Sequence, residues 1–288
     1  MKDACRISAE ALRVAGEAVK PGVTTYEIDN IVRSYIEKQG AVPSFLGYGG
    51  FPASACISVN NVVIHGIPSK ELVLKEGDIV SVDVGAFYGG FHGDNAFTFP
   101  CGKISADAQA LLDATKESLY EGIKQALAFN RVGDIGNAVQ KYVEARSYSV
   151  VRDFVGHGVG AKLHEDPSVP NYGTAHRGVR LIPGMTIAIE PMVNQGRCNV
   201  RVLDDKWTTV TADGKLQSGE SDRIDAPVHK IHRLLVKALG NVFIEHMGRL
   251  DSQRAVHIDR EAVMSGDESL LLDLTDKVKD LLRPAHCE

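Results

Sequence analysis

The segment Ile79-Val-Ser-Val-Asp-Val-Gly-Ala-Phe-Tyr-Gly-Gly-Phe-His-Gly-Asp94 decides the fold class of this chain. Apolar and polar residues alternate up to Tyr88 and two glycines follow, a pattern that predicts a strand, a tight turn and a returning strand. With the turn centred between Tyr88 and Gly89, we expect the carboxylates of Asp83 and Asp94 directly opposite each other. Opposed residues hold their Cβ atoms about 4.5–5.5 Å apart, where like charges are destabilising. A divalent cation between them is therefore expected; the alternative is two unrelated surface aspartates.

The chain also repeats itself with an offset of 107 residues, as between Asp83 and Glu190. The helical pattern of residues 23–37 recurs at 131–144, and the strand pattern of 74–83 recurs at 181–190. One helix and one strand per copy predict an α+β architecture with two αβ halves about a pseudo-twofold axis, packed around an antiparallel sheet, rather than a solenoid. A site at that axis would collect carboxylates from both halves.

Composition excludes several classes of function. The chain has 288 residues, a net charge of −5 and a pI near 6.1, which gives no bulk electrostatic reason for specific nucleic-acid binding. Its five cysteines are scattered without CxxC spacing, so we expect reduced thiols, a cytoplasmic location and no zinc–thiolate site. No apolar run approaches the ~20 residues of a membrane span, and the first residues lack the apolar core of a signal peptide.

The expected elements mix helices and short strands. Thr24 and Glu27 form a predicted capping box at the start of one helix. Helices are expected over residues 3–19, 24–40, 105–130 and 134–146. Strands are expected over 55–59, 62–64, 79–84, 96–99, 149–153, 186–190 and 207–211.

Four histidines lie where chemistry could use them. His157 stands between two glycines, which allow backbone and ligand to approach closely. His65 ends an apolar strand, His164 precedes Glu-Asp-Pro, and His92 lies close to Asp94. A lone histidine is more often a structural residue, and His92 is assigned that role. The Gly-His-Gly setting of His157 is harder to explain in this way.

A series of ordered motifs resembles the type I methionine aminopeptidases, which have the pita-bread fold. The resemblance runs from about residue 10 to residue 216 and includes Lys20-Pro-Gly-Val, Leu46-Gly-Tyr, Cys56-Ile-Ser-Val-Asn60, His65-Gly-Ile-Pro68, Phe91-His-Gly-Asp94, Ser149-Val-Val-Arg152, Gly156-His-Gly158, His164-Glu-Asp-Pro167, Leu181-x-Pro-Gly-Met185, Ile189-Glu-Pro-Met192 and Trp207. It implies a centre of two divalent metal ions (Co, Mn, Fe or Zn). Four of its five protein ligands would be Asp83, Asp94, His157 and Glu190.

The same resemblance implies an activity and its residues. The enzyme would be a hydrolase, a metallo-exopeptidase that removes the initiator methionine from nascent peptides by attack of a metal-activated hydroxide on the first peptide bond. Glu190 would move the proton of the attacking water, and His65 and His164 would flank the scissile amide. The residues expected near the methionine are Tyr48, Phe51, Leu163 and Trp207, with His65 and His164. The implied partners are nascent N-termini and the ribosome exit region, with a monomeric enzyme and no membrane.

The chain departs from the family after Leu216. Family members continue into a Ser-Ala-Gln-x-Glu-His-Thr strand whose glutamate bridges both metals. Here Ser221 stands at that position, and Glu220 is one residue early, which on a strand points it to the other face. Glu245 has a similar local context but would require a long insertion. We therefore expect a metallo-aminopeptidase domain over 1–216 and a divergent, helical tail over 217–288, whose origin as a frameshifted, fused or natural end stays open.

Three functions remain open at this point. The first is a working methionine aminopeptidase in which the fifth ligand is replaced or dispensable. The second is a catalytically weakened relative that acts as a peptide-binding or ribosome-associated module. The third is an aminopeptidase for X-Pro peptides, which the contexts of His65 and Trp207 disfavour.

Overall fold

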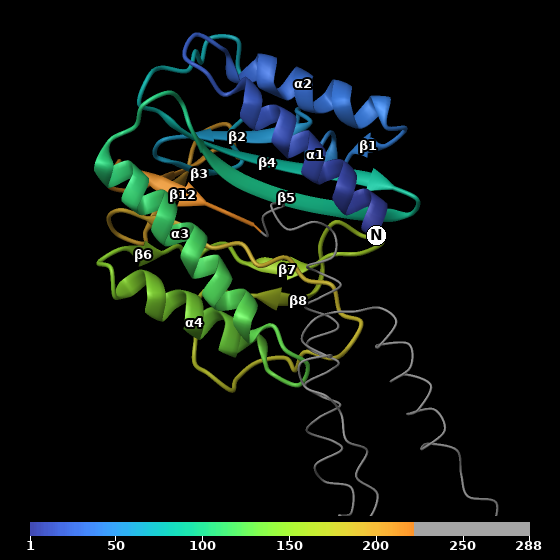
Figure 1. The fold of residues 1–288 in the computed structure, drawn as a ribbon, viewed down its shortest axis with the longest axis vertical. Coiled ribbons are helices and arrows are strands. Elements are labelled where there is room, and N and C mark those ends of the chain that lie inside the picture. Colours follow the sequence, from blue (N-terminus) through green and yellow to red (C-terminus); the bar gives the residue numbers. More distant parts are fainter. Residues whose placement is uncertain (222–288) are drawn as a thin grey trace, which may run out of the picture. The chain divides into compact units, whose positions relative to one another are not determined.

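Two α-helices followed by a run of antiparallel strands make up each half of the chain (Figure 1). The computed structural model describes residues 1–221, which lie in a compact unit spanning Met1–Ala226. The first half contains α1 (Lys2–Ala18), α2 (Thr25–Lys38), β1 (Val42–Pro43), the 3-10 turn η1 (Tyr48–Gly50), β2 (Ala55–Val59), β3 (Val62–Ile64), β4 (Ile79–Tyr88) and β5 (Phe91–Pro100). The second contains α3 (Ala106–Gln125), α4 (Val132–Glu144), β6 (Ser149–Val150), β7 (Gly156–Gly158), β8 (Glu165–Val169), β9 (Met192–Asn194), β10 (Val200–Val202), β11 (Thr209–Thr211) and β12 (Gln217–Gly219).

The strands form several small antiparallel sheets. In the largest, β4 pairs with β5 and also with β1 and β2. The others have the orders β10-β11-β3, β12-β9-β6 and β7-β8. In Figure 1, α1 and α2 lie with the first-half strands, whereas α3 and α4 pack against each other beside the second-half strands. This arrangement agrees with the expected pair of αβ halves.

Backbone pairing confirms the repeat of 107 residues. The pairing of β1 with β4 recurs as the pairing of β6 with β9, in the same register. The isolated bridge between Thr24 and Val73 likewise recurs between Arg131 and Arg180. The two halves therefore share their strand connections as well as their sequence pattern.

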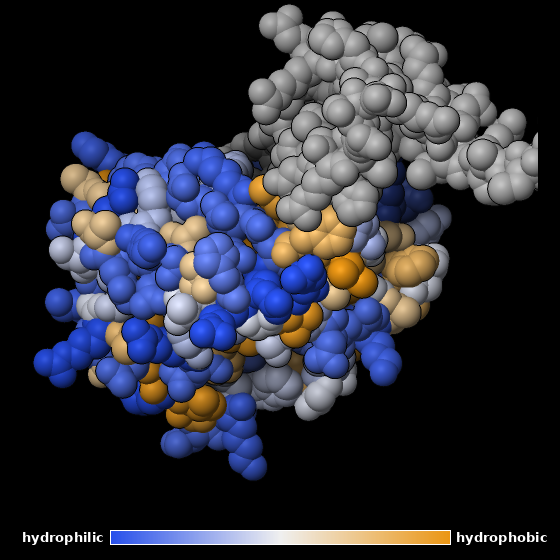
Figure 2. All heavy atoms as spheres, turned by 90° about the horizontal axis from the view of Figure 1, so that it is seen from below, coloured by the Kyte–Doolittle hydropathy of each residue, from blue (hydrophilic) through white to orange (hydrophobic). Residues whose placement is uncertain are grey.

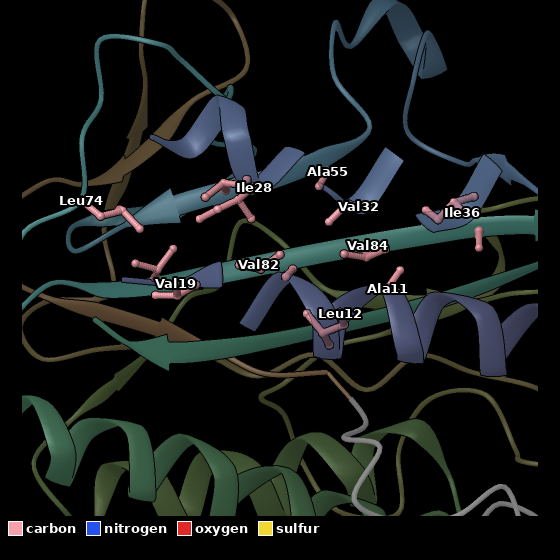
Figure 3. Packing of buried hydrophobic residues seen from close by; sticks show 14 of the residues in the cluster. Ala11, Leu12, Val19, Ile28, Val32, Ile36, Ala55, Leu74, Val82 and Val84 are labelled. Carbon is pink, nitrogen blue, oxygen red and sulfur yellow. The ribbon is translucent and has the colours of Figure 1, made fainter. Parts of the chain in front are cut away.

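The repeat helices α2 and α4 bury equivalent apolar stripes. Residues four apart lie on one face of a helix, so each stripe points toward its own half of the core. The stripe residues are all fully buried: Ile28, Val32 and Ile36 in α2, and Ile135, Val139 and Val143 in α4. Burial of each such side chain contributes about 1.5–3 kcal/mol. Figure 3 shows side chains of α1, α2, β2 and β4 meeting in the first-half core.

The hairpin of β4 and β5 differs from its predicted register. Gly89 and Gly90 form the turn with φ angles of 58° and 85°, the conformation favoured in two-residue hairpin turns. The hairpin centre therefore lies one residue further along than predicted. As a result, Asp94 pairs with Gly85 and is not directly opposite Asp83.

The segment that carries Glu190 is not the regular strand predicted over 186–190. Its pairing is limited to an isolated bridge between Ile187 and Gly158. Two features explain this: the partner strand β7 has three residues, and Pro191 follows without an N–H for a strand ladder. The predicted strands over 149–153 and 207–211 are also shorter, as β6 and β11.

Residues 217–221, which the sequence analysis assigns to the tail, pack into the fold. Strand β12 pairs with β9, and Glu220 and Ser221 are 2% and 4% exposed. The remainder of the predicted helical tail, residues 222–288, lies outside the described residues. Within residues 1–221, no helix has the length and apolar character to cross a membrane. The face in Figure 2 is largely hydrophilic with scattered apolar patches.

Candidate metal centre

Three of the four predicted metal ligands come together. Asp94 lies on β5, His157 on β7, and Glu190 on the irregular segment before β9, and their ligand atoms all lie within 4.8 Å of one another. Nε2 of His157 is 3.5 Å from Oδ2 of Asp94 and 3.2 Å from Oε1 of Glu190. The cluster thus contains one carboxylate from each half of the fold and an imidazole from the second half.

Asp83, the fourth predicted ligand, lies on β4 next to this cluster. Its Cα partners are Cys56 on β2 and Ala96 on β5. Because Asp94 lies two residues from Ala96 on β5, the two aspartates share one face of the hairpin as diagonal neighbours. Burial, followed by the charges of Asp94 and Glu190, raises the pKa of Asp83 well above its usual range.

The cluster concentrates negative charge in a buried place. Burial and the charge of Glu190 raise the pKa of Asp94 from 3.8 to about 7. Burial alone lowers the pKa of His157, but Glu190, the carbonyl of Gly158 and Asp94 outweigh it and raise that pKa to about 9. The cluster therefore holds protons at neutral pH. A divalent cation would displace these protons, which is the usual competition at a metal site.

Two further observations fit a bound cation. Oε1 of Glu190 is buried and lies 3.2 Å from Nε2 of His157, with no well-formed hydrogen bond among residues 1–221. Such buried polar atoms are rare and need an explanation, which an ion provides. In addition, Nδ1 of His157 lies 2.8 Å from the carbonyl oxygen of Gly158 and can donate to it. This bond leaves Nε2, the atom that faces the carboxylates, as the metal-binding nitrogen.

The two predicted catalytic histidines border the cluster. The ring of His164 lies 4.1 Å from that of His157, and its Nδ1 is 2.8 Å from the hydroxyl of Tyr48. The ring of His65 lies 5.8 Å from that of Trp207. Burial is the main cause that lowers the pKa of both His65 and His164. Both imidazoles are therefore neutral at pH 7, so each ring has one N–H donor and one acceptor.

An apolar cluster lies beside the carboxylates. Its buried members are Phe45, Phe51, Ala53, Cys56 and Leu163, with Ile67 and Trp207 packed against them. The rings of Phe51 and Trp207 meet edge to face at 5.2 Å. Cys56 connects this cluster to the metal ligands because it pairs with Asp83; burial, Asp83 and Asp94 raise the pKa of its thiol. Cys56 was not among the predicted site residues, since strand pairing is what brings it next to Asp83.

A cavity of about 570 Å³ gives access to the cluster. Its lining residues are Val155, Gly156, His157, Lys162, His164, Glu165, Asp166 and Ser168. His157 and His164 therefore face a space large enough for part of a peptide, lined by residues of the paired strands β7 and β8 and of the segment that connects them.

A buried carboxylate–imidazole cluster beside an apolar cluster, on two repeated αβ halves, is the arrangement expected of a metal-dependent hydrolase. The sequence matches metallopeptidase family M24 over residues 1–248, and the chain belongs to this family.

Within this family, the chain is similar to proteins named methionine aminopeptidase. The chain is 56% identical over 218 residues to the methionine aminopeptidase of Clostridium perfringens, which covers 76% of this chain and 87% of that protein. It is 52% identical over 215 residues to methionine aminopeptidase 1 of Bacillus subtilis, covering 75% and 86%. The crystal structure of methionine aminopeptidase from Thermotoga maritima superposes with a TM-score of 0.76 at 46% identity, covering 77% and 89%. This likeness confirms the fold that the sequence motifs implied.

Proposed function

We propose that this chain is a methionine aminopeptidase, which hydrolyses the first peptide bond of nascent chains and releases the N-terminal methionine. One observation carries the proposal: the ligand cluster of Asp94, His157 and Glu190 adjoins an apolar cluster that contains Phe51 and Trp207. Cys56 of the apolar cluster is the strand partner of Asp83, so a substrate could place an apolar side chain beside the hydrolytic centre. The names of the relatives support the same activity.

The centre would hold two divalent cations on Asp83, Asp94, His157 and Glu190. Three carboxylates and one imidazole form a donor set that suits Mn, Fe, Co or Zn. When bound, such ions supply Lewis acidity, which polarises a peptide carbonyl and makes water nucleophilic near neutral pH.

The residues of the chain then move the protons and orient the substrate. Oε1 of Glu190, buried and without a hydrogen-bond partner in the described part, accepts the proton of the attacking water and returns it to the leaving amine. Because Nδ1 of His164 is engaged with Tyr48, its Nε2 is left to hydrogen-bond the substrate. His65 lies on the side of Trp207, so the two neutral imidazoles can bind the developing oxyanion and the amide.

The apolar cluster would select methionine. Phe45, Phe51 and Cys56 are each less than 9% exposed, and Trp207 packs against their cluster, so an apolar side chain that enters beside Trp207 would meet an apolar surface. The cluster borders Asp83, so the same substrate residue would place its free α-amine near the carboxylates. This geometry favours an exopeptidase for N-terminal methionine.

Ser221 is the reason to expect a weak second metal. Its N–H donates to the carbonyl oxygen of Ala96 at 3.0 Å, and its Oγ accepts a hydrogen bond from the N–H of Ala96. Ala96 is the strand partner of Asp83, so Ser221 stands beside the site with a hydroxyl already engaged by backbone. Without a carboxylate here, the second cation would lose a ligand, which supports a weakened enzyme that needs metal in excess.

Substrate, location and assembly follow from the proposed activity. The partners are nascent peptide N-termini, which would place the protein in the cytoplasm and near the ribosome exit region, as a monomer. The thiols of Cys56, Cys101 and Cys198, which form no disulfide within residues 1–221, suit a reducing compartment.

Peptide cleavage by the purified chain tests the proposal. Met-Gly-Met and Leu-Gly-Met would be incubated with the protein in Mn²⁺ or Co²⁺, and the released residue measured. We expect release of methionine that Glu190→Gln abolishes and excess metal increases. Absence of cleavage with Mn²⁺, Co²⁺, Fe²⁺ and Zn²⁺, each supplied in turn, or comparable cleavage of the leucine peptide, would exclude this function.

A further inference from the structure

Glu190 has less backbone support than Asp83, its counterpart in the repeat. Asp83 lies inside β4, with β2 on one side and β5 on the other. Glu190 lies between the isolated bridge at Ile187 and strand β9, and Pro191 follows it without an N–H, although the carbonyl oxygen of Pro191 accepts from the N–H of Glu220. Other contacts must therefore fix the position of this carboxylate.

Asn171 supplies such a contact. Its side chain is fully buried, and its Nδ2 donates to the backbone carbonyl oxygen of Glu190 at 2.6 Å. Its Oδ1 has no hydrogen-bond partner in the described part of the chain. A buried polar atom in this state costs about 1–3 kcal/mol. Asn171 has no counterpart in the first half, because the residue 107 positions earlier is Ile64.

Helix α4 holds Asn171 in turn. Nδ2 of Asn137 donates to the carbonyl oxygen of Gly173 at 2.8 Å, and the N–H of Gly173 donates to Oε1 of Gln140 at 3.0 Å. A Cβ on Gly136 would lie 2.4 and 2.5 Å from the carbonyl oxygens on either side of Asn171, so the helix and this segment are in close backbone contact. The support of Asn171 is therefore a helix of the core.

We infer that Asn171 is a positioning residue for Glu190: it replaces the missing strand hydrogen bond and aims the carboxylate at Asp94 and His157. The inference rests on the proposed metal-dependent function. Groups that orient a metal ligand typically account for 10–100-fold in metal affinity or activity. The role of Asn171 is thus expected in metal binding more than in folding.

Asn194 is a matched control within the same chain. It is also fully buried, its Nδ2 donates to the carbonyl oxygen of Arg197 at 2.9 Å, and its Oδ1 likewise has no partner among residues 1–221. It lies on β9, and its hydrogen bond leads to a turn and not to a predicted ligand. Loss of Asn194 should therefore affect folding as the loss of Asn171 does, without affecting the metal.

Calorimetric titration of the full chain with Mn²⁺ tests the inference, together with thermal unfolding in chelator. We expect Asn171→Ala to raise the Kd for Mn²⁺ roughly tenfold or more, and to lower kcat in saturating Mn²⁺ with little change in KM. Asn171→Leu keeps the shape and removes the unpaired Oδ1, so it should unfold near the wild-type temperature yet bind Mn²⁺ as weakly as the alanine variant. Asn194→Ala should lower the unfolding temperature and keep the wild-type Kd.

The outcomes separate the two proposals. A wild-type chain that binds Mn²⁺, with both Asn171 variants binding it equally well, would overturn the positioning role alone. The same holds if Asn194→Ala weakens Mn²⁺ binding as much as Asn171→Ala. A wild-type chain that binds none of Mn²⁺, Fe²⁺, Co²⁺ and Zn²⁺ would overturn the proposed function and the positioning role together.

Discussion

Replacement of Asp94 by asparagine should stabilise the metal-free protein and destabilise the metal-loaded one. The carboxylates of Asp83, Asp94 and Glu190 repel one another in a buried site, and the pKa of Asp94 rises from 3.8 to about 7. Each pKa unit corresponds to 1.36 kcal/mol, so full ionisation of Asp94 in the metal-free fold costs about 4 kcal/mol. Asp83 shares these protons and the new amide must find its own hydrogen bonds, so we expect a net gain of about 2–3 kcal/mol.

The gain in stability of the metal-free Asp94→Asn variant should increase as the pH rises. A carboxyl group with a higher pKa in the folded than in the unfolded state destabilises the fold once it ionises. For Asp94 this penalty is absent below pH 3.8, grows between pH 3.8 and about 7, and is complete above that range. Asp94→Asn should therefore stabilise the chelated protein at pH 8 and have little effect near pH 4.

Urea unfolding in EDTA and in Mn²⁺ measures how Asp94→Asn changes the free energy of unfolding of the metal-free and of the metal-loaded protein. Ligand at 100 times its Kd stabilises a protein by about 2.7 kcal/mol, and Asp94→Asn should lose most of this stabilisation. Asp134 serves as control: it is 7% exposed and accepts the backbone N–H groups of Arg131 and His176, so Asp134→Asn should destabilise the protein in both conditions. If Asp94→Asn destabilises the metal-free protein at pH 8, repulsion among the carboxylates does not lower the stability of the metal-free fold.

Three further outcomes are expected. His157→Ala should lower metal occupancy, measured by atomic emission, at least tenfold. His92→Ala should not, because the imidazole of His92 is hydrogen-bonded to Ser44 and not to the cluster. Equal losses of metal in the two variants would contradict the assignment of His157. Ser221→Glu should raise turnover at limiting metal at least tenfold, about 1.4 kcal/mol of barrier, and unchanged turnover would mean that the site needs no further carboxylate. Peptides that begin with norleucine, which has a methylene in place of the methionine sulfur, should remain modest substrates. A change of one such group in an apolar pocket alters the binding free energy by about 1–3 kcal/mol. Failure to cleave these peptides would indicate a specific contact with sulfur.

Local patterns in the chain were enough to predict much of this protein. Apolar alternation predicted the β4–β5 hairpin, and the capping residues Thr24 and Glu27 predicted the start of α2, because these signals involve residues a few positions apart. The repeat of the α2 pattern predicted α4. The repeat offset related Glu190 to Asp83, since duplicated halves keep equivalent positions. Family motifs then suggested the roles of the histidines, which remain proposals.

Long-range pairing decided the remainder. A turn centred one residue later moved Asp94 away from direct opposition to Asp83, because the register of a hairpin depends on its turn geometry. The contact of Cys56 with the ligands and that of Ser221 with Ala96 each join segments far apart in the chain. Asn171 carried no signal in the sequence, since an asparagine gains its role only from the backbone carbonyl that folding brings within 2.6 Å of its amide. Short-range patterns specify elements, whereas the ligand geometry arises from contacts between residues that only the packed chain brings together.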